Sequence, residues 1–170
     1  QRVPVPVMGG VAVYTGLLVA TIAIVFITHN YRIIPIIFAM TVMLAIGVWD
    51  DIKNLPATLR FIVEIALVWG LMASTGKYID SFHGLWGIQG VDVFVSLPLS
   101  LLAGVGIINA VNLIDGVDGY SSSYGILTNM VFALIFFSVG YRTMGLLSVA
   151  CACAIVPFFF HNVFGKSSKM

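Results

Sequence analysis

The feature that indicates both the fold and the chemistry of this chain is the stretch Asn109-Ala110-Val111-Asn112-Leu113-Ile114-Asp115-Gly116-Val117-Asp118-Gly119. It follows a long apolar run and places two amides, two carboxylates and two glycines within eleven residues. A second acidic pair, Asp50-Asp51, also stands where an apolar run ends. Together the two segments hold four of the seven acidic residues. Since 60% of the residues are hydrophobic and 9% are charged, carboxylates gathered at the ends of apolar runs indicate a site that uses them.

The apolar runs predict an all-α integral membrane protein. A membrane-spanning helix needs about 20 mostly apolar residues, and six segments of the 170-residue chain approach this length. We expect residues 1–170 to form a single transmembrane domain. The third span is short and carries Glu64, so a re-entrant course is the alternative for it. The six predicted spans are 9–28, 33–49, 61–74, 93–108, 124–139 and 144–164.

The connection between the third and fourth spans predicts a short β-hairpin near 78–90. Its apolar residues alternate around Gly84 and Gly87, which suits a tight turn between two strands. Trp86 and Tyr78 are typical of the membrane interface. We expect this hairpin on the outer face.

Six crossings place both acidic segments on the same side of the membrane. Lys53, Arg60, Asn109 and Asn112 fall on that side too, whereas a re-entrant third span would separate the two segments. Basic residues favour the side of the acidic segments, which indicates the cytoplasm. On that side lie Arg2, Lys53, Arg60, Lys166 and Lys169, against Arg32, Lys77 and Arg142 on the other.

The acidic side chains predict a cation-assisted site for a phosphorylated ligand. Asp50 and Asp51 point about 100° apart on a helix, so we expect one to face a cation or reacting group and the other to accept hydrogen bonds or balance a Lys or Arg. Asn112 and Asp115 share a helical face and offer the oxygen ligands that suit Mg²⁺, with Mn²⁺ as an alternative. Gly116 and Gly119 let the backbone turn sharply. The plainer alternative is that each segment only ends a helix in water.

The charge pattern argues against nucleic-acid binding, because the net charge is +1 and the basic residues are scattered singly. The first residue is Gln1 rather than Met, and the end at Lys169-Met170 has no stop-like tail. We therefore expect an internal fragment of a longer protein. Glycines within the spans suit helix packing, either inside one chain or in a homodimer.

Three blocks of sequence, in order, carry a family resemblance. Pro6-Val7-Met8-Gly9-Gly10 fits a Pro-x-x-Gly-Gly motif, and Gly47-Val48-Trp49-Asp50-Asp51-Ile52-Lys53-Asn54-Leu55 fits an Asp-Asp block. The stretch 109–119 fits the signature Asn-x-x-Asn-x-x-Asp-Gly-x-Asp-Gly. In these blocks the chain resembles the polyprenyl-phosphate N-acetylhexosamine-1-phosphate transferases, glycosyltransferase family 4. Arg60 keeps a basic position of the family, whereas Glu64 stands where Gln is usual.

The resemblance implies transfer of N-acetylhexosamine-1-phosphate, first of all GlcNAc-1-phosphate, from a UDP-sugar to a polyprenyl phosphate such as undecaprenyl phosphate. UMP would be released, in cell-wall or surface-polysaccharide synthesis. The resemblance also implies Mg²⁺ as a cofactor, a multi-pass enzyme of ten to eleven helices in the inner membrane, and an active site facing the cytoplasm. UDP-N-acetylhexosamine, polyprenyl phosphate and membrane lipid would be its partners. The implied residues are Asp50, Asp51, Asp115 and Asp118 for catalysis, Lys53, Arg60, Asn109, Asp118, Gly9 and Gly10 for substrate, and Asn112 and Asp115 for metal.

Two other functions fit parts of the pattern. The CDP-alcohol phosphotransferases share the beginning Asp115-x-x-Asp118-Gly119, but their pattern continues with Ala-Arg where this chain has Ser122-Ser123. A cation-coupled transporter fragment would use acids along a path across the bilayer. Here the acids gather at one face, which favours the transferase.

Overall fold

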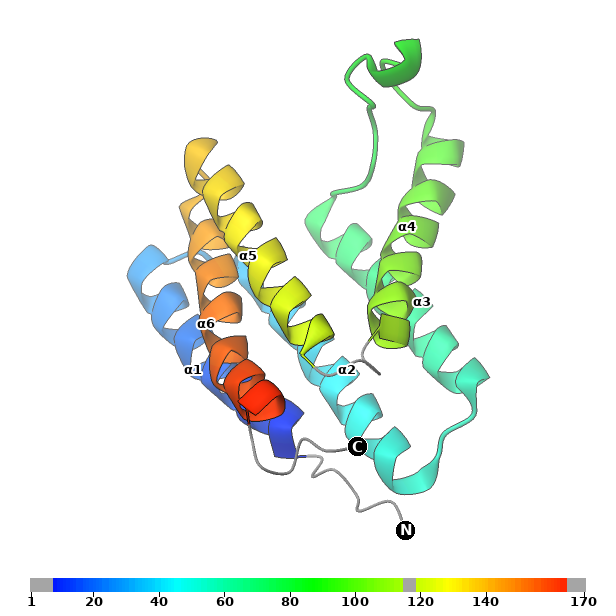
Figure 1. Cartoon of the computed structure of the whole chain (residues 1–170). Coiled ribbons are helices and arrows are strands. Elements are labelled where there is room, and N and C mark those ends of the chain that lie inside the picture. The colour runs from blue at the N-terminus through cyan, green and yellow to red at the C-terminus, as the bar shows by residue number, and fades with distance from the viewer. Residues whose placement is uncertain (1–7, 115–118, 165–170) are drawn as a thin grey trace. The chain divides into compact units, whose positions relative to one another are not determined.

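A computed structural model of the chain describes residues 8–114 and 119–164. These residues form six long helices (Figure 1). The 3-10 turns η1 (Tyr31–Ile33) and η2 (Leu85–Gly87) lie in two of the connections. The all-α prediction with six spans is therefore confirmed. The helices are α1 (Met8–Thr28), α2 (Ile34–Lys53), α3 (Ala57–Thr75), α4 (Val93–Ile114), α5 (Tyr120–Ser138) and α6 (Arg142–Phe164).

Helix α3 is longer than the sequence predicted. It runs without interruption for 19 residues, from the residue after Pro56 to the residue before Gly76. Pro56 suits the start because it has no N–H to leave unpaired, and Gly76 ends the helix in the left-handed conformation that glycine favours (φ 63°). Its length and composition are sufficient to cross a membrane, as the shared-side prediction requires.

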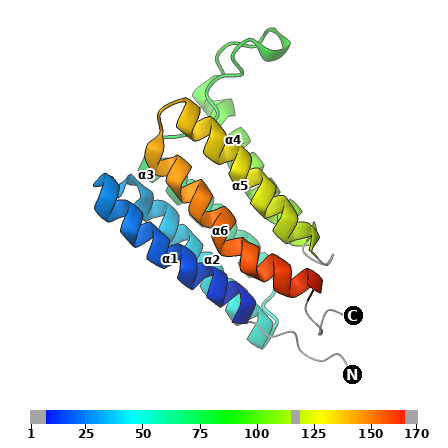
Figure 2. The ribbon, with the colours of Figure 1, turned by 60° about the vertical axis from the view of Figure 1, so that its left-hand side comes forward.

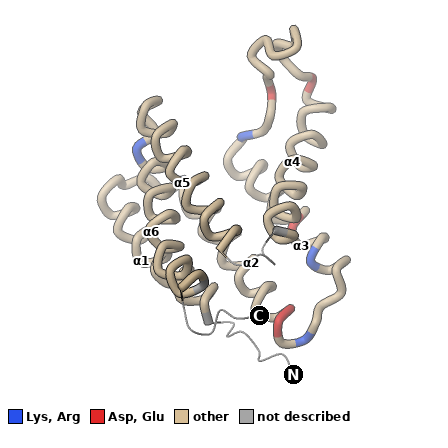
Figure 3. Tube along the Cα trace, viewed as in Figure 1, with Lys and Arg blue, Asp and Glu red and all other residues tan. Residues whose placement is uncertain are grey.

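The surface of the helices suits lipid rather than water. All six are long and apolar enough to span a membrane, and large apolar side chains project outward along them, such as Phe26 (74% exposed) and Phe94 (85% exposed). Charged positions lie mostly toward helix ends and connections, as Figure 3 shows. Backbone polar groups are satisfied inside helices, and lipid tails can cover the apolar side chains. The chain is therefore a multi-pass membrane protein.

The chain divides into two compact units, one made of Gln1–Ile37 with Ile114–Met170 and the other of Phe38–Leu113. In the first unit α6 packs against both α1 and α5 (Figure 2). Small residues allow this packing: a Cβ at Gly9 would lie 2.8 Å from Cε2 of Phe158. That residues 1–170 form a single domain stays a prediction.

In the second unit α3 and α4 approach each other closely. A Cβ added at Gly104 on α4 would lie 2.7 Å from Cγ1 of Val68 on α3. Since real Cβ atoms essentially never come this close to a neighbour, glycine at this position allows the contact.

The predicted hairpin near 78–90 is wrong. No strand forms in the described residues, and a single antiparallel bridge joins Ser81 to Gly90. Gly84 and Gly87 have φ angles of 86° and 78° and fold the tip into the 3-10 turn η2, which leaves too little extended chain for a ladder. Hydrogen bonds to Ser96 and Ser100 hold the base of this connection on α4.

Candidate functional site

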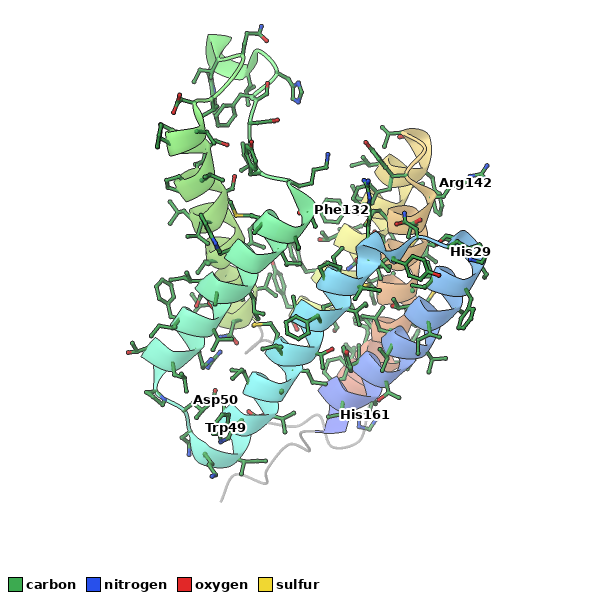
Figure 4. The ribbon with its side chains drawn as sticks, turned by 180° about the vertical axis from the view of Figure 1, so that it is seen from behind. His29, Trp49, Asp50, Phe132, Arg142 and His161 are labelled. Atoms are coloured by element: carbon green, nitrogen blue, oxygen red, sulfur yellow. The ribbon has the colours of Figure 1, made fainter. Side chains whose placement is uncertain are left out.

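The first acidic segment is built around the carboxylate of Asp50, at the end of α2 (Figure 4). One oxygen, Oδ1, accepts a hydrogen bond of 2.8 Å from the backbone N–H of Leu55. The other, Oδ2, lies 2.8 Å from Nη1 of Arg60. Asn54 makes the turn between them with a positive φ of 49°. Asp50 therefore closes the connection between α2 and α3 and orients Arg60 with a charged hydrogen bond.

The side chain of Asp51 has different surroundings from that of Asp50. It is exposed, as is the side chain of Lys53. The two adjacent carboxylates thus have different surroundings, as their angle on the helix predicted. Asp50 is the one that balances an arginine, and Asp51 is open to a ligand.

The second acidic segment is connected to the first through α3. Arg60 and Glu64 are four residues apart on α3 and so share one face of that helix. Arg60 binds Asp50, and Glu64, which is 3% exposed, accepts a hydrogen bond from Nδ2 of Asn109 on α4. Within this unit, therefore, the acidic pair and the start of the stretch 109–119 lie at the same end of α3.

Asn112 follows one turn after Asn109 and is exposed near the end of α4. Asp115, Gly116 and Asp118 lie outside the described residues, so the predictions made for them stay predictions. In the ranges 8–114 and 119–164, no group of three or more His, Cys, Asp or Glu residues is arranged to hold a metal.

Gly119 is the N-cap residue directly before α5, and its conformation confirms the sharp turn predicted at that position. Its φ is 71°, and a Cβ there would lie 2.5 Å from Cγ2 of Val163 on α6. Both the backbone and the packing therefore require glycine. Gly9, packed on Phe158, and Gly10, exposed, lie at the start of α1. Their role in substrate binding stays a prediction.

Glu64 is the residue that sequence reasoning left without a role. Two signals were available: it is an acidic residue inside an apolar span, and it follows Arg60 by one helical turn. Neither signal identifies Asn109 as its partner, because the two residues are 45 positions apart in the sequence.

Comparison with known proteins gives the family. A sequence model described as "Glycosyl transferase family 4" matches residues 33–168, a range that contains both acidic segments. No solved structure matches the chain.

Three relatives are similar over nearly the whole chain. The chain is 28% identical over 158 residues to the "Probable undecaprenyl-phosphate N-acetylglucosaminyl 1-phosphate transferase" of Bacillus subtilis, covering 92% of this chain and 44% of that protein. It is 26% identical over 179 residues to the phospho-N-acetylmuramoyl-pentapeptide-transferase of Staphylococcus carnosus, covering 96% and 56%. It is 29% identical over 182 residues to the decaprenyl-phosphate N-acetylglucosaminephosphotransferase of Mycobacterium leprae, covering 94% and 44%.

The chain spans about half the length of these relatives. The family match covers most of the chain, and the residues it covers include the polar ends of α2 and α4 that the fold brings to one end of α3. This chain belongs to glycosyl transferase family 4.

Proposed function

We propose that this protein transfers N-acetylhexosamine-1-phosphate, with GlcNAc-1-phosphate as the first candidate, from a UDP-sugar to a polyprenyl phosphate. The observation that carries the proposal is the family match over residues 33–168, which includes both acidic segments. The names of the relatives support it: those from Bacillus subtilis and Mycobacterium leprae name a polyprenyl phosphate and an N-acetylglucosamine-phosphate transfer. Undecaprenyl phosphate is the first acceptor to test.

In the proposed reaction an oxygen of the lipid phosphate attacks the β-phosphorus of the UDP-sugar. A new P–O bond forms, the bond from the β-phosphorus to the bridging oxygen breaks, and UMP leaves. The product is a sugar joined to the lipid by a pyrophosphate. Such a transfer depends mainly on in-line positioning and on neutralisation of phosphate charge.

Arg60 is the described residue best suited to neutralise phosphate charge. A guanidinium carries five N–H donors, and the ion pair with Asp50 uses Nη1. The remaining donors are sufficient for a phosphate, and Asp50 keeps the group oriented. We assign the lipid phosphate to Arg60 with Lys53, and the acceptance of its proton to the carboxylates of Asp50 and Asp51.

The second segment is assigned to the UDP-sugar and a cation. Asn112 and Asp115 offer oxygen ligands of the kind that Mg²⁺ takes, and Asp118 offers acceptors for an N–H edge of the base. A bound Mg²⁺ would neutralise charge on the pyrophosphate. Gly10, which is exposed at the start of α1, would leave room for substrate, and Gly9 beside it would let α1 pack on Phe158.

The setting proposed for this reaction is the cytoplasmic face of the inner membrane. The excess of basic residues on the side of the acidic segments supports that orientation. The pathway would be cell-wall or surface-polysaccharide synthesis, and the enzyme would act alone or as a homodimer.

The test is release of UMP by the intact protein in detergent, with UDP-N-acetylglucosamine, undecaprenyl phosphate and Mg²⁺. Asp115→Asn should lower the rate by about 100-fold or more, as loss of a charge-stabilising group does. Asp80→Asn, in the exposed connection between α3 and α4, is the matched control and should keep normal turnover.

Normal turnover in Asp115→Asn would contradict the assignment of that residue. If no UDP-sugar gave UMP but vesicles containing the protein took up a cation, the transporter function would replace the transferase.

A further inference from the structure

The side-chain amide of Asn109 has both of its N–H groups directed at acceptors. Nδ2 donates to Oε2 of Glu64 on α3 and, at 2.9 Å, to the carbonyl oxygen of Val105 one turn earlier on α4. An asparagine amide has two N–H donors and one carbonyl oxygen. Two acceptors therefore use its full donor capacity, and Oδ1 is the polar atom left for a ligand.

The orientation of this amide follows from its neighbours. If the group were turned by 180°, Oδ1 would face the Glu64 carboxyl group and the Val105 carbonyl oxygen, both of which are acceptors. Asparagine orientations must be assigned from such networks, and this one favours a single arrangement. Val105 alone would hold one N–H, so Glu64 supplies the second contact and fixes the direction of Oδ1.

The interface between α3 and α4 makes this contact strong. Glu64 is 3% exposed, and the Gly104–Val68 approach brings the same two helices together about one turn away along α3. A hydrogen bond inside such an interface has little competition from water, and loss of one partner leaves the other unsatisfied. The pair therefore holds Asn109 firmly at the end of α4 that leads to Asn112.

We propose that Glu64 is a positioning residue that turns the amide of Asn109 so that its carbonyl oxygen faces the substrate. Asn109 then accepts a hydrogen bond from a hydroxyl or N–H group of the UDP-sugar and does not donate to a phosphate. This inference rests on the proposed function. It predicts that position 64 needs a hydrogen-bond acceptor and does not need a negative charge.

The first test compares two variants at position 64 in the intact protein. Glu64→Gln keeps an acceptor oxygen of the same reach, and its turnover should stay within about twofold of the wild type. Glu64→Leu has similar bulk but no acceptor, and it should raise KM for the UDP-sugar about tenfold, the cost of about 1.4 kcal/mol of lost binding. The KM for polyprenyl phosphate should not change.

The second test reverses the polarity of the pair. Asn109→Asp directs a carboxylate oxygen at Glu64 and should raise KM for the UDP-sugar about tenfold or more. Adding Glu64→Gln gives that oxygen an N–H partner, so the double variant should recover part of the loss. Coupling of this kind is expected between residues in contact or in one hydrogen-bond network, whereas the effects of distant, independent sites add.

The outcomes separate the two proposals. If Glu64→Leu released UMP at the wild-type rate with an unchanged KM for the UDP-sugar, the positioning role would be overturned and the proposed function would stand. Glu64→Gln as impaired as Glu64→Leu would also overturn it, since a charge would then be needed. Changes in thermal midpoint without changes in KM would mean a purely structural contact. A wild type that releases no UMP would overturn both proposals.

Discussion

The two acidic segments of this molecule differ in how far along the chain their binding partners lie. Asp50 is held by residues five and ten positions away, Leu55 and Arg60. Asn109 is held by Glu64, 45 positions away. Gly119, at the other end of the second segment, packs on Val163 of another helix. The first segment is thus organised locally, and the second depends on helix packing at both ends.

This difference has an energetic consequence. A local turn needs only its own residues, so substitutions there remove one or two hydrogen bonds at a partly exposed position. In a segment held by packed helices, a change of one residue removes its contacts and also forces the two helices apart, because packed interiors have little free volume. We therefore expect larger effects at the ends of the second segment than in the first.

The largest effect is expected for Gly119→Ala. A side chain at φ 71° costs about 1–2 kcal/mol, and the overlap of its Cβ with Val163 adds about 1–3 kcal/mol of overpacking. Thermal unfolding of the intact protein in detergent should show a clear fall in the midpoint. The control is Gly140→Ala, also at positive φ (82°) but with no atom within 4 Å of the added Cβ.

Gly140→Ala should cost only the backbone term, about 1–2 kcal/mol. Adding Val163→Ala to Gly119→Ala should restore part of the stability, because it makes room for the new methyl group. Equal losses at Gly119 and Gly140 would show that packing on α6 does not matter for the second segment.

An intermediate effect is expected for Asp50→Ala. It removes a charged hydrogen bond to Arg60 and a backbone cap at Leu55, so we expect a loss of about 1.5–3 kcal/mol in the free energy of unfolding. Asp51→Ala, next to it and exposed, should change stability by less than about 0.5 kcal/mol. Denaturation curves in detergent would compare the two variants, and similar losses would contradict the different surroundings seen for these carboxylates.

The smallest effect is expected for Arg60→Lys. Lysine can still pair with Asp50, whose side chain is 23% exposed, but it lacks the planar group that orients the contact. The stability loss should be below about 1 kcal/mol, while KM for polyprenyl phosphate should rise if Arg60 binds that phosphate. Lys77→Arg, at an exposed position in the connection between α3 and α4, is the control for charge-preserving exchange. A stability loss as large as that of Asp50→Ala would mean that Arg60 does more than close the local turn.

The sequence by itself determined the six helices and the two acidic segments. Length and apolar composition are properties of each segment alone, and a membrane-spanning backbone has few alternatives to a helix. The motif spacing also identified the family, which the match over residues 33–168 confirms. The turn at Gly119 was predictable as well, because an Asp-Gly pair after an apolar run favours a sharp turn.

Only the tertiary structure decided which polar side chains meet. The hairpin prediction failed because the angles at Gly84 and Gly87 close a 3-10 turn, which the alternation of apolar residues does not reveal. The contact between Glu64 and Asn109 depends on the antiparallel approach of α3 and α4 and on the small size of Gly104. Sequence patterns report the periodicity of one helix, whereas a contact across 45 residues is set by how two helices pack.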